Sequence, residues 1–131
     1  MKPITEFVTE AKEYIGESKT LPPEMEAGIK KLFAAAAKNY SEGYPDRKAE
    51  KEKEYLDGMS YSVGGKYIKL ITGLGGQRSV YGFIVNTKDD PKFKYGDMLK
   101  AAGWNAPATN FSRGNVLEFD KVKTVNWTSI M

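Results

Sequence analysis

Hydrophobic residues recur at helical spacing near the start of the chain. Over residues 4–15 they stand three and four positions apart, as on one face of an α-helix: Ile4, Phe7, Val8, Ala11 and Ile15. Gly16 allows this helix to end. Pro22 and Pro23 can open a second helix, because proline is tolerated only in a first turn. Its expected apolar face comprises Met25, Ile29, Leu32, Phe33, Ala36 and Tyr40.

The next segment, residues 46–57, is almost entirely charged. Opposite charges stand three or four positions apart, as for Glu50 and Lys53, and such pairs support an exposed helix by a few tenths of a kcal/mol each. The pattern therefore predicts a solvated helix.

From Met59 onward the period changes from helical to strand-like. Three runs rich in β-branched and aromatic residues, 59–63, 66–72 and 79–87, are separated by a glycine pair at 64–65 and by a glycine-rich loop at 73–76. Strands joined by short glycine turns predict an antiparallel meander. Gly82 stands inside the third run and suggests a bulge or a close backbone approach.

Two later segments are less regular. Asp97 either caps a short helix that ends at Gly103 or belongs to a turn before a strand, and the strand-like neighbours favour the second interpretation. Residues 115–119 and 122–127 resemble two closing strands around a turn at Asp120 and Lys121.

These elements predict one α+β domain over residues 1–131, with N-terminal helices packed on a small C-terminal antiparallel β-sheet or barrel. The expected sheet core comprises Ile68, Leu70, Val80, Ile84, Val85, Val116 and Val125. The helices should pack on it through Phe7, Ile29, Leu32 and Phe33, and both Phe33 and Phe83 should be buried.

Charge divides the chain at the same place. Residues 1–58 carry 10 basic and 12 acidic side chains, whereas residues 59–131 carry 10 basic and 5 acidic ones. The helical part is thus acidic and the strand-rich part is basic, which permits polyanion binding by the second part.

Composition excludes several chemistries. The chain has no cysteine and no histidine, so disulfides, thiolate or imidazole metal sites and Ser-His-Asp catalysis are ruled out. No convergent pair of carboxylates and no calcium-loop spacing is visible. We therefore expect no enzymatic activity, no metal and no cofactor.

The glycine-rich stretch 73–78 is the only candidate for a phosphate-binding loop. It lacks the third glycine of the dinucleotide fingerprint and the Gly-Lys-Ser/Thr ending of a P-loop, and it joins two strands. A hairpin loop is the better interpretation, although Arg78 could reach an anion beside the loop amides.

Cations and aromatic residues alternate through the strand-rich part: Lys66, Tyr67, Lys69, Arg78, Tyr81, Lys92, Phe93, Lys94, Tyr95, Lys100, Trp104 and Arg113. Small sheets that bind single-stranded nucleic acid combine such residues, but aromatic residues also pack sheets and lysines cover their exposed faces. Gly114 and Asn115 favour a structural corner, and Arg113 at that corner, beside the loop 104–108, could close a pocket. The candidate ligand-binding residues are Arg78, Tyr81, Lys94, Trp104, Arg113 and Asn115.

Over about residues 59–128 the chain resembles a family of small uncharacterised proteins of tailed bacteriophages. The similar residues are 66–69, 79–85, 92–104, 106–108, 113–116 and 126–128. Family members often continue past the tryptophan with a Thr-Gly-Pro turn, where this chain has Ser129-Ile130-Met131. The resemblance implies a phage origin and brings no known activity or catalytic residues.

Residues 1–15 mix glutamates with their apolar residues and form no signal-peptide core, and no apolar run reaches membrane-spanning length. We therefore expect no membrane association. Together with the resemblance, this predicts a non-enzymatic phage accessory protein in the host cytoplasm that binds a host protein, a phage protein or a small anionic ligand. The alternatives are a single-stranded nucleic-acid-binding module and a virion or assembly component.

Overall fold

The computed structural model describes residues 21–122 and 125–130. The helix expected over residues 4–15, and with it Phe7, lies outside these ranges. The described elements are α1 (Pro23–Ser41), η2 (Pro45–Arg47), α2 (Lys48–Asp57), β2 (Ser60–Val63), β3 (Tyr67–Thr72), η3 (Leu74–Gly76), β4 (Ser79–Val85), β5 (Met98–Leu99), β6 (Ala101–Gly103), β7 (Ala106–Pro107) and η4 (Val116–Lys121).

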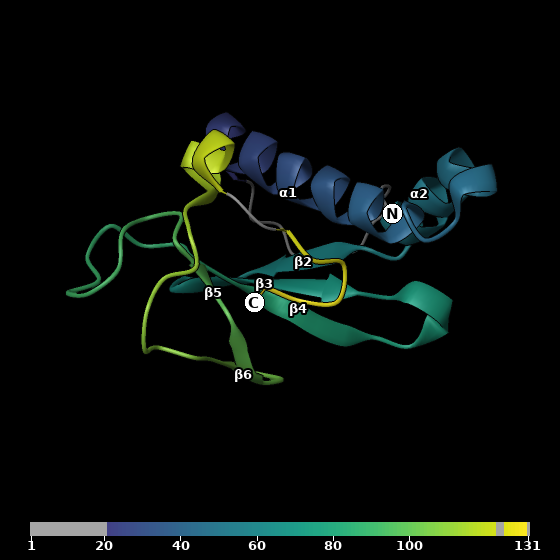
Figure 1. Cartoon of the computed structure of the whole chain (residues 1–131). Helices are drawn as coiled ribbons and strands as arrows, with labels where there is room; N and C mark the ends of the chain where they lie inside the picture. Colours follow the sequence, from purple (N-terminus) through teal and green to yellow (C-terminus); the bar gives the residue numbers. More distant parts are fainter. Residues whose placement is uncertain (1–20, 123–124, 131) are drawn as a thin grey trace, which may run out of the picture.

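The fold is α+β, as predicted. Helices α1 and α2 cover one face of an antiparallel four-stranded sheet of order β2-β3-β4-β5, and the two-stranded β6–β7 hairpin lies beyond its other face (Figure 1). Within the described residues the sheet stays open and closes into no barrel. The glycine stretch at 73–76 joins β3 to β4, so its interpretation as a hairpin loop is confirmed.

Helix α1 begins where the prolines predict. Pro23 stands in its first turn with Glu24 and Glu26, and Lys38 stands in its last turn, so both ends carry charges that favour the helix dipole. Gly28 lets α1 approach η4, because a Cβ there would stand 2.5 Å from the carbonyl oxygen of Val116.

Helix α2 is the solvated helix that the charge pattern predicts. Tyr55 is its one buried residue, and ion pairs lie along its surface, including Lys53 Nζ to Asp57 Oδ2 at 2.8 Å and Lys51 Nζ to Glu54 Oε1 at 3.1 Å. Lys53 thus pairs with Asp57 rather than with Glu50. Exposed pairs of this kind stabilise a helix only weakly.

A β-bulge in β4 determines which side chains face the helices. Leu70 pairs with Gly82 and Ile71 pairs with Val80, so Tyr81 is an extra residue in β4. Tyr81 therefore joins Ile84 in the core beneath the helices, and Val80 turns to the outer face. The bulge expected from Gly82 is confirmed.

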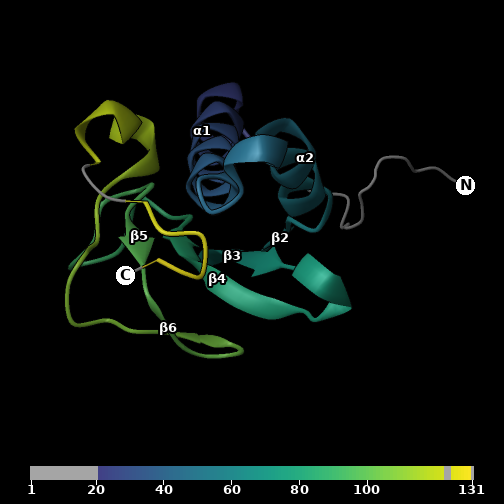
Figure 2. The same cartoon turned by 45° about the vertical axis from the view of Figure 1, so that its right-hand side comes forward.

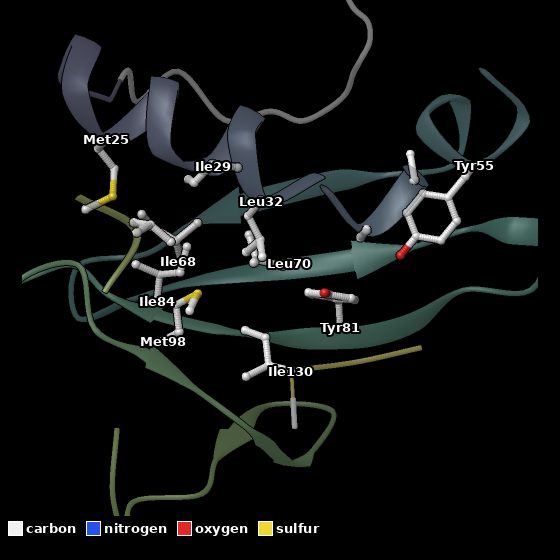
Figure 3. Close-up of a cluster of buried hydrophobic side chains, with 13 residues drawn as sticks. Met25, Ile29, Leu32, Tyr55, Ile68, Leu70, Tyr81, Ile84, Met98 and Ile130 are labelled. Atoms are coloured by element: carbon white, nitrogen blue, oxygen red, sulfur yellow. The ribbon is translucent and has the colours of Figure 1, made fainter. Parts of the chain in front are cut away.

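Both faces of the sheet are buried, and most of the predicted core is correct. Beneath the helices lie Met25, Ile29, Leu32, Tyr55, Ile68, Leu70, Tyr81, Ile84, Met98, Val116 and Ile130 (Figure 3). On the outer face lie Phe83, Val85, Phe93 and Leu99. Phe33, Val80 and Val125 are only partly buried and pack at the edges of these clusters, so the full burial expected for Phe33 is wrong.

Residues 97–103 are extended, which confirms the strand interpretation, but the strand expected over 115–119 is wrong. Val116–Lys121 forms the 3-10 helix η4 instead. The side chain of Asn115 accepts a hydrogen bond from the amide of Leu117 at 2.8 Å and so caps the helix. The close approach of Gly28 then holds Val116 against α1.

The strand expected over 122–127 is also wrong in its described part, and a strap takes its place. Residues 125–130, here called the C-terminal strap, run between the helix layer and β4 (Figure 2). The Tyr81 hydroxyl donates to the carbonyl of Asn126 at 2.6 Å, and the Tyr55 hydroxyl donates to that of Trp127 at 2.6 Å. The amide of Ile130 donates to the carbonyl of Tyr81 at 2.8 Å. The two tyrosine hydroxyls therefore donate to strap carbonyls that would accept backbone amides if the strap were a β-strand.

Candidate anion-binding surface

An exposed tryptophan flanked by two cations stands out on the outer side of the sheet. Trp104 lies at the turn between β6 and β7, and its side chain is 46% exposed. The Nζ atom of Lys69 lies 4.6 Å from the indole centroid, and the Cζ atom of Arg78 lies 5.8 Å from it. Lys69 lies in β3, Arg78 directly precedes β4, and Trp104 lies in the β6–β7 turn. Three separate segments of the chain therefore build this group. We call it, together with Asn105, the Trp104 surface.

Strand alternation puts Lys69 there. Its neighbours Ile68 and Leu70 point into the core beneath the helices, so Lys69 and Tyr67 point to the outer face. Lys69 pairs across the ladder with Phe83, whose ring meets that of Tyr67 edge-on at 6.1 Å. This outer apolar cluster supports the β6–β7 hairpin and thereby the position of Trp104.

Among the described residues no carboxylate forms an ion pair with either cation of the Trp104 surface. The Lys69 ammonium donates to Asn105 Oδ1 at 2.5 Å, which is a neutral acceptor. Partial burial, and secondly the charge of Arg78, lower the pKa of Lys69. The segments that carry Lys69, Arg78 and Trp104, residues 59–88 and 98–117, contain no aspartate or glutamate. Within the described part of the chain, the site therefore presents two cations without a carboxylate partner beside an exposed aromatic ring.

Of the six candidate residues, the structure brings together Arg78 and Trp104. Tyr81 is 1% exposed with its hydroxyl bonded to the strap, so its ring is not available for stacking on an external ligand. Lys69 belongs to this surface although the candidate set omitted it. Along residues 67–70, Tyr67 and Lys69 alternate with the aliphatic Ile68 and Leu70. This alternation is the sequence signal that places Lys69 on the outer face.

Lys94 and Asn115 lie elsewhere, in the lining of a hollow of about 200 Å³. The hollow is lined by Lys94, Asp97, Ser112, Gly114, Asn115, Glu118, Lys121 and Val122. It holds two amines and two carboxylates, and Lys121 already pairs with Glu118 at 3.6 Å. Its lining therefore has no excess of either charge.

Asn115 is occupied by contacts within the protein. Its Nδ2 donates to the carbonyl of Tyr95 at 2.9 Å and to Asp97 Oδ1 at 3.0 Å, and its Oδ1 caps η4. Asp97 Oδ2 accepts from the amide of Lys94 at 2.9 Å. Asn115 and Asp97 thus fasten the loops around the hollow.

Arg113 stacks on an exposed ring of its own. Its Cζ atom lies 4.0 Å from the ring centroid of Phe111, which is 54% exposed. Among the described residues no acceptor lies within reach of its buried Nε–H group.

Within residues 21–122 and 125–130 no group of three or more acidic side chains could hold a metal ion. No helix in the same ranges combines the length and the apolar character needed to cross a membrane. Comparison with known proteins adds no identity: no protein-family model, no curated protein and no solved structure matches this sequence.

Proposed function

We propose that the protein is a non-enzymatic binding protein whose Trp104 surface binds single-stranded nucleic acid. The observation that carries the proposal is the exposed indole flanked by Lys69 and Arg78, neither of which forms an ion pair with a carboxylate of the described residues. Proteins that bind single strands combine aromatic rings, on which bases stack, with cations that follow the phosphates.

Each part of the surface then has a role. The face of Trp104 stacks on a base, which contributes about 1–3 kcal/mol per base in known cases. Lys69 and Arg78 contact the flanking phosphates, and each contact releases a counterion from the strand. Burial, and after it repulsion from Arg78, lowers the pKa of Lys69, and a phosphate between the two cations offsets that repulsion.

A small anion explains less of the surface. It would contact the two cations but make no contact with the indole ring. Trp104 also lies on an exposed hairpin turn and does not line the hollow near Lys94. A polymer with aromatic bases uses both kinds of group.

A protein partner is the second candidate, favoured by a separate aromatic patch on the helix side. Tyr40 lies between Tyr44 and Trp127, with ring centroids 5.4 and 5.2 Å away, and both of these neighbours are 37% exposed. Lys51 Nζ lies 4.6 Å from the ring centroid of Tyr44. Aromatic residues are enriched among the side chains that dominate protein–protein binding energy.

The biological setting remains part of the proposal. The sequence resemblance to tailed-phage proteins supports an accessory role in the host cytoplasm, with a structural role in the virion as the alternative. Mass spectrometry of purified phage particles separates the two, because a virion component is present there in stoichiometric amount and an accessory protein is not.

Fluorescence anisotropy with labelled twelve-nucleotide DNA and RNA strands tests the binding proposal. Wild type should bind at low salt and weaken steeply toward physiological salt. Trp104→Ala should lose about 5- to 150-fold in affinity. Lys69→Ala should reduce the slope of log affinity against log salt by about 1.

Lys31→Ala serves as the matched control, because Lys31 is an exposed cation on α1, across the sheet from β6 (Figure 1). Absence of binding at low salt, or equal losses from Lys31→Ala and Lys69→Ala, would overturn the nucleic-acid proposal. Capture of a host or phage protein that survives nuclease and is lost in Tyr44→Ala would support the second candidate instead.

A further inference from the structure

One long irregular hairpin, residues 97–115, carries two exposed aromatic rings that each lie against a cation, Trp104 and Phe111. At its base Asp97 bridges Asn115, and Met98 exchanges backbone hydrogen bonds with Arg113 and Gly114 at 2.8 and 2.7 Å. Further along, the amide of Ala108 donates to the carbonyl of Lys100 at 2.7 Å. Trp104 stands at the tip of this hairpin and Arg113 at its base.

Phe111 is presented by an interruption of the hairpin ladder. Ala108 bonds to Lys100 and Arg113 bonds to Met98, so residues 109–112 loop out opposite Leu99 alone. The Nζ atom of Lys92 donates to the carbonyl of Thr109 at 2.7 Å and ties this loop to the body. The loop is thereby held in place while it exposes an aromatic ring, which is 54% exposed.

The Nε–H group of Arg113 is a buried donor without a hydrogen-bond acceptor among the described residues. The guanidinium of Arg113 stacks on Phe111. An unpaired buried donor is unfavourable and calls for an explanation. A phosphate oxygen that draws the guanidinium outward would pair this donor without breaking any hydrogen bond that it makes in the free protein. The forked guanidinium is suited to such a contact.

We infer that Phe111 and Arg113 form a second contact for the same nucleic-acid strand, so that the hairpin 97–115 binds it at both ends. This inference rests on the proposed function of the Trp104 surface. The contact at Phe111 and Arg113 resembles the contact at Trp104 in kind, since each places an arginine over an exposed ring, with the Cζ atom 4.0 Å from the Phe111 centroid and 5.8 Å from the Trp104 centroid.

The hairpin sets the length of strand required. Six residues separate Met98 from Trp104, which corresponds to about 20 Å at most, at ~3.4 Å per residue. A strand stacked as in duplex DNA rises ~3.4 Å per nucleotide, so at most about six nucleotides are needed to span the two contacts. A nonamer is therefore long enough to occupy both contacts, whereas a trinucleotide, which spans about 10 Å at this rise, is expected to occupy one.

Competition anisotropy with oligothymidylates of three, six, nine and twelve nucleotides tests the inference on the full chain. In wild type, affinity should rise about tenfold or more between the trimer and the nonamer, because the second contact becomes intramolecular once the first has formed. Phe111→Ala and Arg113→Lys should each remove most of that rise. Arg113→Lys keeps the charge and loses the fork, and Phe111→Ala alters an exposed side chain, so neither endangers the fold.

The outcomes separate a failure of the second contact at Phe111 and Arg113 from a failure of nucleic-acid binding by the Trp104 surface. Binding that depends on Trp104 but shows the same length dependence in wild type, Phe111→Ala and Arg113→Lys overturns the second contact and leaves the Trp104 surface standing. Absence of binding to every oligonucleotide at low salt overturns both. A fall in affinity for the nonamer in Phe111→Ala, with the trimer unchanged, supports the inference.

Discussion

Ile130 of the strap lies directly over Gly82 of β4. A Cβ atom on Gly82 would stand 2.8 Å from the Cγ1 atom of Ile130 and 3.0 Å from the carbonyl oxygen of Leu99. Ile130 is 5% exposed, so its side chain fills a space that only glycine at position 82 leaves open. The bulge at Tyr81, the missing side chain at Gly82 and the strap therefore depend on one another.

Gly82→Ala should destabilise the fold by about 1–3 kcal/mol, because the added methyl group meets the Ile130 side chain first and then the carbonyl oxygen of Leu99. Urea denaturation measures the change. Gly103→Ala is the matched control, since a Cβ there meets nothing within 4 Å, and it should be close to neutral.

A double-mutant cycle identifies Ile130 as the partner. Ile130→Ala alone should cost about 2–5 kcal/mol. Combined with Gly82→Ala, it should cost clearly less than the two single changes added together, because the new methyl group then occupies part of the vacated space. Strict additivity would show that the two residues do not share this space.

The strap should loosen when its tyrosine hydroxyls are removed. Tyr55→Phe and Tyr81→Phe each delete one hydrogen bond to a strap carbonyl and should cost about 0.5–1.5 kcal/mol each. Hydrogen exchange of the Ile130 amide should accelerate in both variants, because that amide bonds to Tyr81 within the same arrangement. Unchanged exchange would mean that the hydroxyls do not hold the strap.

The same tyrosines predict a loss of stability at high pH. Burial raises the pKa of Tyr55 and of Tyr81 well above the ordinary value of 10.0. A group whose pKa is higher in the folded state stabilises the fold fully below its unfolded pKa and progressively less above it. The free energy of unfolding should therefore fall as the pH rises above about 10, and it should fall less steeply in the Tyr55→Phe/Tyr81→Phe variant. Equal slopes in the variant and wild type would contradict this.

Lys69 offers a direct electrostatic readout of the Trp104 surface. Its pKa is lowered first by burial and then by Arg78, so Arg78→Gln should raise it. An added single strand should raise it too, because a phosphate favours the charged ammonium. NMR titration of the Lys69 side chain measures both shifts, and a pKa that ignores Arg78→Gln would mean that the two cations do not interact.

Local chemistry made part of this structure predictable from the sequence. The prolines before α1 and the glycine inside β4 each act within a few residues of where they stand, so the helix start and the bulge were correct. Residues 115–119 were misassigned because their apolar pattern suits a strand or a 3-10 helix equally. The choice was made by the Asn115 side chain and by Gly28, a contact between distant parts of the chain.

The candidate site shows the same division. Residue type marked Arg78 and Trp104, and alternation along β3 could have added Lys69. Tyr81 is among the ligand-binding candidates because Gly82 indicates a bulge but does not show which side chain that bulge turns into the core. The orphaned donor of Arg113 depends on packing and could be seen only in the structure.

Intrinsic fluorescence of Trp104 tests the central claim most directly. The chain has two tryptophans, so Trp127→Phe leaves Trp104 as the sole reporter on the proposed surface. Titration with a twelve-nucleotide single strand should quench it saturably at low salt, through base stacking, with an apparent affinity that falls as salt rises. Unchanged Trp104 fluorescence at low salt, while anisotropy of the same strand reports binding, would place the ligand elsewhere and contradict the account.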